Sequence, residues 1–211
     1  MAYDFKKEQK ELYQPKTASV VEVPGMAFIM VDGAGDPNTA ESYKSAMEIL
    51  YGLSYSIKMS KMGGKAPAGY FDYVVPPLEG LWWLADNGII DFTEKDKYCW
   101  TSMIRQPDFV TPEVFEEASM TLSKKKPGLD LDAARFALFT EGLCAQILHV
   151  GSYDDEPETI AKLEKFIIES GYQNDVSDLR RHHEIYLNDP RKTTPEKTKT
   201  IIRHPIKEAL T

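Results

Sequence analysis

The chain is poor in the features that mark disulfide-stabilised, membrane-embedded or nucleic-acid-binding proteins. Only two of its 211 residues are cysteines, Cys99 and Cys144, which lie far apart in apolar, strand-like segments. We expect two buried free thiols in a reducing cytoplasm. No apolar run approaches about 18 residues and no secretory segment is found at the N-terminus, which predicts neither a membrane span nor export. The net charge of -8 leaves no basic excess for general nucleic-acid binding.

Motifs for metals, cofactors and nucleophilic catalysis are missing as well. His182 and His183 are adjacent, and neighbouring strand residues point to opposite faces, so they cannot chelate one metal ion. Gly33-Ala34-Gly35 lacks the third glycine of a dinucleotide-binding loop. No Gly-x-Ser-x-Gly elbow occurs. The sequence therefore predicts no metal site and no cofactor.

The composition is typical of a globular protein, with 42% hydrophobic and 27% charged residues. Residues 1–17 mix acidic and basic side chains, and we expect a loosely ordered polar arm there. Residues 18–211 are long enough to bury a core as a single domain.

The same order of elements occurs twice along this domain. Residues 18–110 contain strand Met26–Val31, a Gly/Asp turn, a helix that starts at Asn38, and two further strands. The first of these two strands consists of two pieces on either side of Pro76-Pro77. Residues 130–207 repeat this order with strand Leu143–Val150, a turn, a helix and two strands. A helix over 112–123, with Thr111 as its N-cap, connects the two halves. The predicted class is α+β: duplicated β-α-β-β units forming a curved antiparallel sheet, with helices on one face and a ligand groove on the other.

An acid in the middle of a predicted strand needs a reason. In His182–Leu187, the period-2 rule places His182, Glu184 and Tyr186 on one face. Either this face is wet, and Glu184 is solvated or paired with Arg180 or Arg181, or the acid lies in a cavity. Both readings are open on the residues alone.

Aromatic residues are concentrated in or beside the predicted strands. Most are expected to pack in the core, but tryptophan and tyrosine also suit the wall of a half-open cavity because their polar atoms need partners. Aromatic rings around one acid would fit a flat, hydrophobic, cationic ligand. The candidate ligand-binding residues are Tyr70, Trp83, Tyr98, Trp100, His149 and Tyr153.

Two segments, Leu143–Glu156 and His182–Pro190, resemble the GyrI-like small-molecule-binding family, and the resemblance extends over about residues 18–207. It implies a duplicated β-α-β-β fold with a central ligand groove. Some relatives are fused to multidrug-sensing regulators, in which an acid at the position of Glu184 meets cationic lipophilic drugs. Others are DNA gyrase inhibitory proteins, and a stand-alone branch hydrolyses cyclopropane-bearing genotoxins.

Two main hypotheses follow from this resemblance. The protein binds a hydrophobic aromatic molecule without changing it, as a drug-sequestering or sensing protein, or it is a hydrolase that protects DNA by opening a cyclopropane ring. For the hydrolase the candidate catalytic residues are Glu184, which would activate a water, and Tyr186, which would stabilise the developing phenolate or hold the water. Burial in an apolar pocket would raise the pKa of Glu184. His149 is equally suited to a structural role.

Overall fold

The computed structural model describes residues 2–64, 66–85 and 94–209. Its helices are α1 (Phe5–Glu8), α2 (Lys10–Tyr13), α3 (Glu41–Met59), α4 (Pro112–Lys125) and α5 (Glu156–Glu169). Its strands are β1 (Ser19–Val23), β2 (Met26–Ala34), β3 (Leu78–Leu84), β4 (Tyr98–Arg105), β5 (Ala134–Phe139), β6 (Gly142–Val150), β7 (Tyr172–Asn174), β8 (His182–Tyr186) and β9 (Lys199–Glu208).

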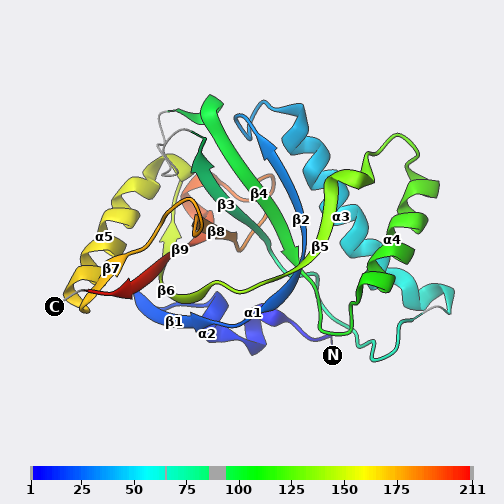
Figure 1. Cartoon of the computed structure of the whole chain (residues 1–211), viewed down its shortest axis with the longest axis horizontal. Coiled ribbons are helices and arrows are strands. Elements are labelled where there is room, and N and C mark those ends of the chain that lie inside the picture. The colour runs from blue at the N-terminus through cyan, green and yellow to red at the C-terminus, as the bar shows by residue number, and fades with distance from the viewer. Residues whose placement is uncertain (1, 65, 86–93, 210–211) are drawn as a thin grey trace.

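These strands form one curved antiparallel sheet in the described part of the chain (Figure 1). Their order is β1-β6-β9-β8-β3-β4-β2-β5, and β7 pairs with β9 beside this path. The first unit supplies the adjacent strands β2-β4-β3, the second supplies β6-β9-β8, and the units meet where β3 pairs with β8. The predicted fold class, α+β with a duplicated β-α-β-β unit, is confirmed.

The edge strands β1 and β5 each continue past a break into an inner strand of the sheet, β2 and β6. Pro24-Gly25 separates β1 from β2, and Thr140-Glu141 separates β5 from β6. Val23 pairs with Gly142 on one side of the breaks, and Met26 pairs with Phe139 on the other. At the first break, Pro24 lacks the backbone N–H that a sheet hydrogen bond needs. Next to the second break, Gly142 adopts a positive φ of 73°.

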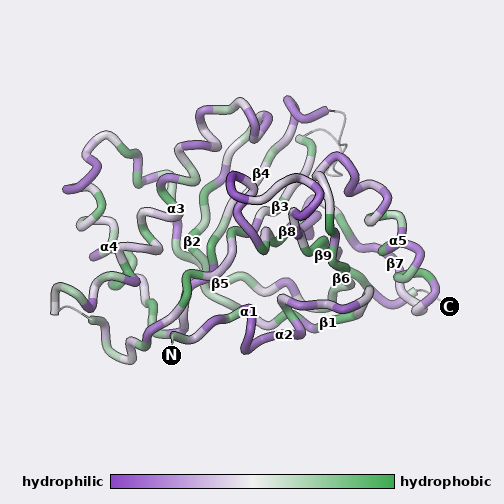
Figure 2. The backbone as a smooth tube through the Cα atoms, turned by 180° about the vertical axis from the view of Figure 1, so that it is seen from behind, coloured by the Kyte–Doolittle hydropathy of each residue, from purple (hydrophilic) through white to green (hydrophobic). Residues whose placement is uncertain are grey.

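Helices α3 and α5 cover the same face of the sheet, at its two ends (Figure 1). Ile49, Leu50 and Leu53 of α3 pack in one apolar cluster with Ile29 and Trp100, and α4 lies against the outer side of α3. Leu163 and Ile167 of α5 pack against the other end of the sheet, with residues of β6 and β9. Apolar residues are concentrated in the central strands, whereas the outer turns are hydrophilic (Figure 2).

The position of the main cavity differs from the expected one. The sequence places a groove on the face opposite the helices, but the large cavity lies on the helical face and is bordered by both α3 and the start of α5. The physical reason is that the two helices stand at opposite ends of a curved sheet and leave its centre uncovered between them.

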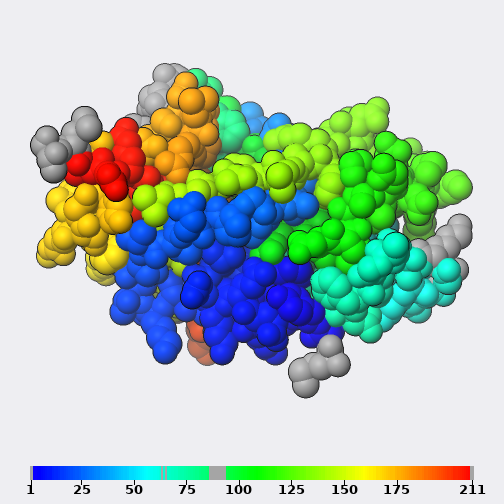
Figure 3. All heavy atoms as spheres, turned by 60° about the horizontal axis from the view of Figure 1, so that its bottom comes forward, coloured from blue at the N-terminus to red at the C-terminus, as the bar shows by residue number. Residues whose placement is uncertain are grey.

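The opposite face is occupied by the N-terminal residues, which the sequence predicts to be a loose arm. They instead form α1 and α2, and Phe5, Leu12 and Tyr13 are buried there. Figure 3, turned to bring the bottom of Figure 1 forward, shows the N-terminal segment in dark blue at the lower centre of the surface. The residues around these three are polar and reach solvent, so the composition of the segment does not reveal that Phe5, Leu12 and Tyr13 anchor it to the sheet.

Local signals for helix ends and strands were partly right. Thr111 caps α4 as predicted, because its hydroxyl accepts from the amide of Val114. Asn38 does not cap α3, whose first residue Glu41 follows Ala40. Residues 70–77 form no strand element, apart from one bridge between Tyr3 and Tyr73. None of the helices described here is long and apolar enough to cross a membrane.

Candidate functional site

The site is built on β8, one of the two strands at the centre of the sheet. His182, Glu184 and Tyr186 point to the helical face, as the alternation predicts. His182 Nε2 lies 3.0 Å from Glu184 Oε1, and the Tyr186 hydroxyl donates to Glu184 Oε2 at 2.6 Å. Glu184 is 6% exposed, so it is a buried acid at a cavity wall and not a solvated one. Arg180, one of its candidate ion-pair partners, pairs with Asp175 instead.

The neighbouring strand β3 supports this arrangement. Trp82 Nε1–H donates to the Tyr186 oxygen at 2.9 Å, so the tyrosine accepts from tryptophan and donates to the acid. Gly80 is paired with Glu184 across the two strands. A side chain at this glycine would collide with the Trp82 indole. The three side chains therefore form a line of hydrogen bonds in which Trp82 donates to Tyr186 and Tyr186 donates to Glu184.

The cavity beside these residues has a volume of about 1330 Å³, which exceeds the usual range of about 300–1,000 Å³ for small-molecule sites. Its aromatic walls come from both units of the chain and from α3. They include Tyr43, Tyr51, Trp82, Tyr98, Tyr153 and Tyr186. Tyr153 meets Tyr186 edge-on, with 6.0 Å between ring centres. Such walls present flat apolar surfaces to a ligand.

A second acid, Glu156, lines the same cavity from the first turn of α5. It is 1% exposed, and burial together with the neighbouring charge of Glu184 raises its pKa well above the usual range. Glu184 shows the opposite behaviour. Burial acts to raise its pKa, but hydrogen bonds from His182 and Tyr186 outweigh it and lower the pKa. The pair therefore holds one proton, on Glu156, and one negative charge, on Glu184.

This corrects the expectation of a raised pKa for Glu184. The sequence suggests burial, but it does not show the donors that surround the carboxylate.

The candidate ligand-binding residues divide into two groups. Tyr98 and Tyr153 line the cavity together with Glu184 and Tyr186. Outside its lining lie Tyr70, Trp83, Trp100 and His149.

Each residue outside the cavity has a structural environment. The Tyr70 hydroxyl donates to the carbonyl of Lys58, and Trp83 lies on the opposite face under the Arg181 guanidinium. Trp100 is fully buried beneath α3. His149 is held between the Thr159 hydroxyl and the Ser152 carbonyl, at 2.8 and 2.9 Å.

Residues of the site that are missing from the sequence-based set include Tyr43, Trp82 and Glu156. Trp82 could have been chosen from alternation, because it is one position from Trp83 and strand neighbours face opposite sides. Tyr43 and Glu156 stand on helices, where their facing depends on how α3 and α5 dock. No local pattern reveals that.

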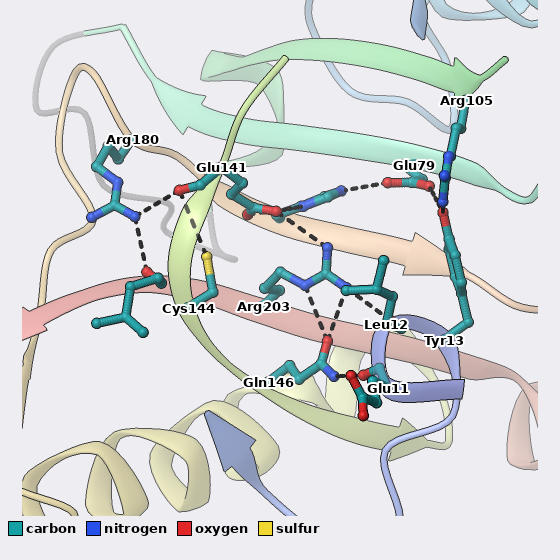
Figure 4. A network of polar contacts seen from close by, with 12 residues as sticks. Glu11, Leu12, Tyr13, Glu79, Arg105, Glu141, Cys144, Gln146, Arg180 and Arg203 are labelled. Atoms are coloured by element: carbon teal, nitrogen blue, oxygen red, sulfur yellow. Dashed lines mark hydrogen bonds and ion pairs between the residues drawn. The ribbon is translucent and has the colours of Figure 1, made fainter. Parts of the chain in front are cut away.

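A separate buried polar network lies on the face covered by α1 and α2 (Figure 4). His183 bridges two acids: its Nδ1 lies 3.0 Å from Glu141, and its Nε2 lies 3.1 Å from Glu79. Arg203 binds Glu141, Gln146 and the carbonyl of Leu12. Burial opposes the charge on His183, yet its acidic neighbours raise its pKa to about 9. The network neutralises its own charges and joins α2 to the sheet.

The GyrI-like small molecule binding domain matches residues 17–207. The chain belongs to this family. It is similar to an uncharacterized conserved protein from Listeria innocua, with 48% identity over 97% of this chain and 100% of the other and a TM-score of 0.92. A structure described as a hydrolase from Listeria innocua shares 47% identity over 97% and 100% of the two chains, with a TM-score of 0.89.

More distant relatives of this GyrI-like domain share the fold alone. The C-terminal domain of EcmrR is 13% identical, with 91% of this chain and 98% of that one covered and a TM-score of 0.53. No protein of curated function is significantly similar to the chain. The chain is therefore a small-molecule binding domain of the GyrI-like type.

Proposed function

We propose that the protein binds a flat, hydrophobic aromatic molecule, including cationic ones, in the cavity between α3 and α5. The observation that carries this proposal is the anionic carboxylate of Glu184 beside aromatic walls. Rings on both sides would take up the apolar body of the ligand, and the single negative charge of the Glu156–Glu184 pair would attract a cationic group.

We further propose that the protein opens the cyclopropane ring of DNA-alkylating genotoxins by adding water, and so protects the cell from such xenobiotics. The similar chain described as a hydrolase supports a hydrolytic reaction. In the proposed step, water oxygen bonds to the cyclopropyl carbon and the ring C–C bond breaks. Its electron pair moves into the conjugated dienone, giving a phenolate, while Glu184 takes the proton from water. Transfer of one proton to the phenolate completes the addition of H₂O.

The hydrogen bonds assign different roles to the tyrosines. The Tyr186 hydroxyl already donates to Glu184, so we assign it to orienting the carboxylate that holds the water. Tyr153 lines the cavity beside it and is our candidate donor to the developing phenolate oxygen.

A non-catalytic binder is the second candidate. It is favoured by the lowered pKa of Glu184, because a carboxylate with a low pKa is a weak base but a persistent negative charge. In that case the cavity would sequester or sense a cationic aromatic drug.

One experiment separates the candidates. The protein and its Glu184→Gln variant are incubated with a spirocyclopropyl-dienone compound, and the product is followed by mass spectrometry. We expect a product heavier by one water with the wild type, and a rate lower by at least about 100-fold with the variant, a loss typical of removing a general base. Tight binding of unchanged substrate would reject the hydrolase in favour of the binder, and no binding of cationic or neutral aromatic compounds would reject both.

A further inference from the structure

A line of hydrogen bonds runs from the cavity acid through the protein to the surface. His182 Nε2 contacts Glu184 Oε1 at 3.0 Å, and His182 Nδ1 contacts His204 Nε2 at 2.8 Å. His204 Nδ1 then contacts the side-chain nitrogen of Asn174 at 3.2 Å. The two imidazoles are 1% and 4% exposed, whereas Asn174, on β7, is exposed to solvent.

The orientation of the Asn174 side-chain amide, at the outer end of this line, is fixed by its other contacts. The backbone N–H of Val176 donates to Asn174 Oδ1 at 2.9 Å, and this fixes which side of the amide carries the oxygen. The Asn174 NH₂ group consequently faces His204, and it also reaches the Glu164 carboxylate at 3.3 Å. Both contacts agree on the amide orientation, because a flipped amide would set its oxygen against a carboxylate and its NH₂ against a backbone N–H.

This orientation determines the proton positions on both rings. An NH₂ group only donates, so His204 Nδ1 must accept. A ring whose Nδ1 accepts carries no proton there, so His204 is neutral and its proton is on Nε2. His204 Nε2–H therefore donates to His182 Nδ1, which must itself accept. That leaves His182 neutral, with its proton on Nε2 and donated to Glu184.

We propose that Asn174 and His204 are positioning residues that hold His182 as a neutral Nε2–H donor to Glu184. They do not touch the cavity, and they act through His182. A neutral donor leaves the negative charge of Glu184 uncompensated and available to a ligand, whereas an imidazolium would cancel it. The significance for ligands rests on the proposed function, but the proton positions do not.

Asn174→Asp tests the mechanism by reversing the outer donor. A carboxylate can still accept from Val176 but cannot donate to His204, and it would accept from a proton on His204 Nδ1. His204 Nε2 would then become an acceptor and draw a proton onto His182 Nδ1. Gln173→Glu is the matched control, because it adds the same charge at the neighbouring position, and Gln173 contacts the carbonyl of Glu208 instead of a histidine.

The ring nitrogens are observed by ¹⁵N NMR at pH 7 in the full chain, which has four histidines to assign. We expect Nε2 protonated and Nδ1 unprotonated on both His182 and His204 in the wild type and in Gln173→Glu. In Asn174→Asp we expect both Nδ1 atoms to be protonated. A protonated Nδ1 on either ring of the wild type, or an unchanged pattern in a folded Asn174→Asp protein, would overturn the proposal.

Binding of a cationic aromatic dye provides the functional arm. We expect Asn174→Asp to weaken dye binding about tenfold, the scale of one well-placed hydrogen bond, and Gln173→Glu to leave it within about twofold. Switched ring protons with unchanged dye affinity would show that the line does not position Glu184. Failure of the wild type to bind any aromatic compound would instead reject the proposed function. The proton positions would still be tested independently by the NMR experiment.

Discussion

Gly80 faces Glu184 across the β3–β8 pair, and its missing side chain leaves the space in which Trp82 reaches Tyr186. A Cβ atom at Gly80 would lie 2.6 Å from Trp82 Nε1 and 3.2 Å from the Tyr186 oxygen. The first distance is too short for any real contact, so the indole would have to move. A glycine in a central strand is therefore part of the site, although it carries no functional group.

Gly80→Ala should damage the site more than the fold. We expect a loss of about 1–3 kcal/mol in unfolding free energy from overpacking, and at least about tenfold weaker binding of an aromatic cation, because the Trp82–Tyr186 hydrogen bond is displaced. Urea unfolding and dye titration would measure both. Gly128→Ala is the control, since nothing lies within 4 Å of a Cβ there, and it should change neither quantity.

Tyr186→Phe should raise the pKa of Glu184. The variant removes the hydroxyl that donates to the carboxylate at 2.6 Å, and a carboxylate with fewer donors is protonated more easily. We expect the lower pH limit of cation binding to move to higher pH. A dye titration between pH 3 and 8 would show this shift, whereas Tyr153→Phe, which removes a hydroxyl not bonded to Glu184, should leave the limit in place. An unchanged limit in Tyr186→Phe would contradict the assigned hydrogen bond.

Glu156→Gln should stabilise the protein at neutral pH. A buried carboxyl with a raised pKa keeps its proton in the folded state, while the unfolded state releases it above its ordinary value of 4.5. Stability is thus lost as pH rises above that value, and the variant, which is always neutral, avoids the loss. A gain of about 1 kcal/mol would raise the melting temperature by roughly 2–4 °C in a chain of this size.

The advantage of Glu156→Gln should disappear near pH 4, where the glutamate is protonated in both states. Thermal unfolding at pH 4 and pH 7 tests this dependence. A variant that is equally stabilised at both pH values would show that Glu156 is not the protonated member of the pair.

His183 should make the protein less stable in alkaline solution. Its pKa is about 9 in the folded state against 6.5 in the unfolded state, so the charged ring contributes its full stabilisation below pH 6.5 and loses it as pH rises through 9. The shift corresponds to about 3 kcal/mol. We expect the melting temperature to fall steadily between pH 6.5 and 9.

His183→Gln separates this group from others that titrate. It should lower stability by about 3–5 kcal/mol at pH 6, because Glu79 and Glu141 lose their charged partner, and it should flatten the decline above pH 6.5. An equal slope in the variant would assign the decline to another group. His149→Gln is the matched control, as that ring contacts Thr159 and Ser152 and no acid.

What the sequence predicts well is what depends on local period. Alternation along β8 places Glu184 with Tyr186, and repeated element order gives the duplicated sheet. The same rule also explains one miss: Trp83 is one residue from Trp82, and a shift of one position moves a side chain to the other face. Trp100 points to the helical face as alternation predicts, but α3 covers it, so correct facing does not ensure access to the cavity.

The remaining misses depend on contacts between distant segments. Glu156 appears in the sequence as an ordinary acid in the first turn of a helix, and only the docking of α5 brings it to Glu184. The N-terminal residues look like a polar arm because their partners lie between 66 and 191 positions away in the chain. No period in the sequence encodes the pairing of α2 with Arg203.

That last contact has a consequence for synthesis. The carbonyl of Leu12 binds Arg203, 191 positions later, and Lys6 binds the carbonyl of Leu187. A ribosome makes residues in order, so α1 and α2 emerge long before the strands that they cover. The docking of α2 is complete only when β9 appears, so its apolar anchors stay partly uncovered during synthesis. This makes the early chain vulnerable to aggregation and the final docking a late, long-range step.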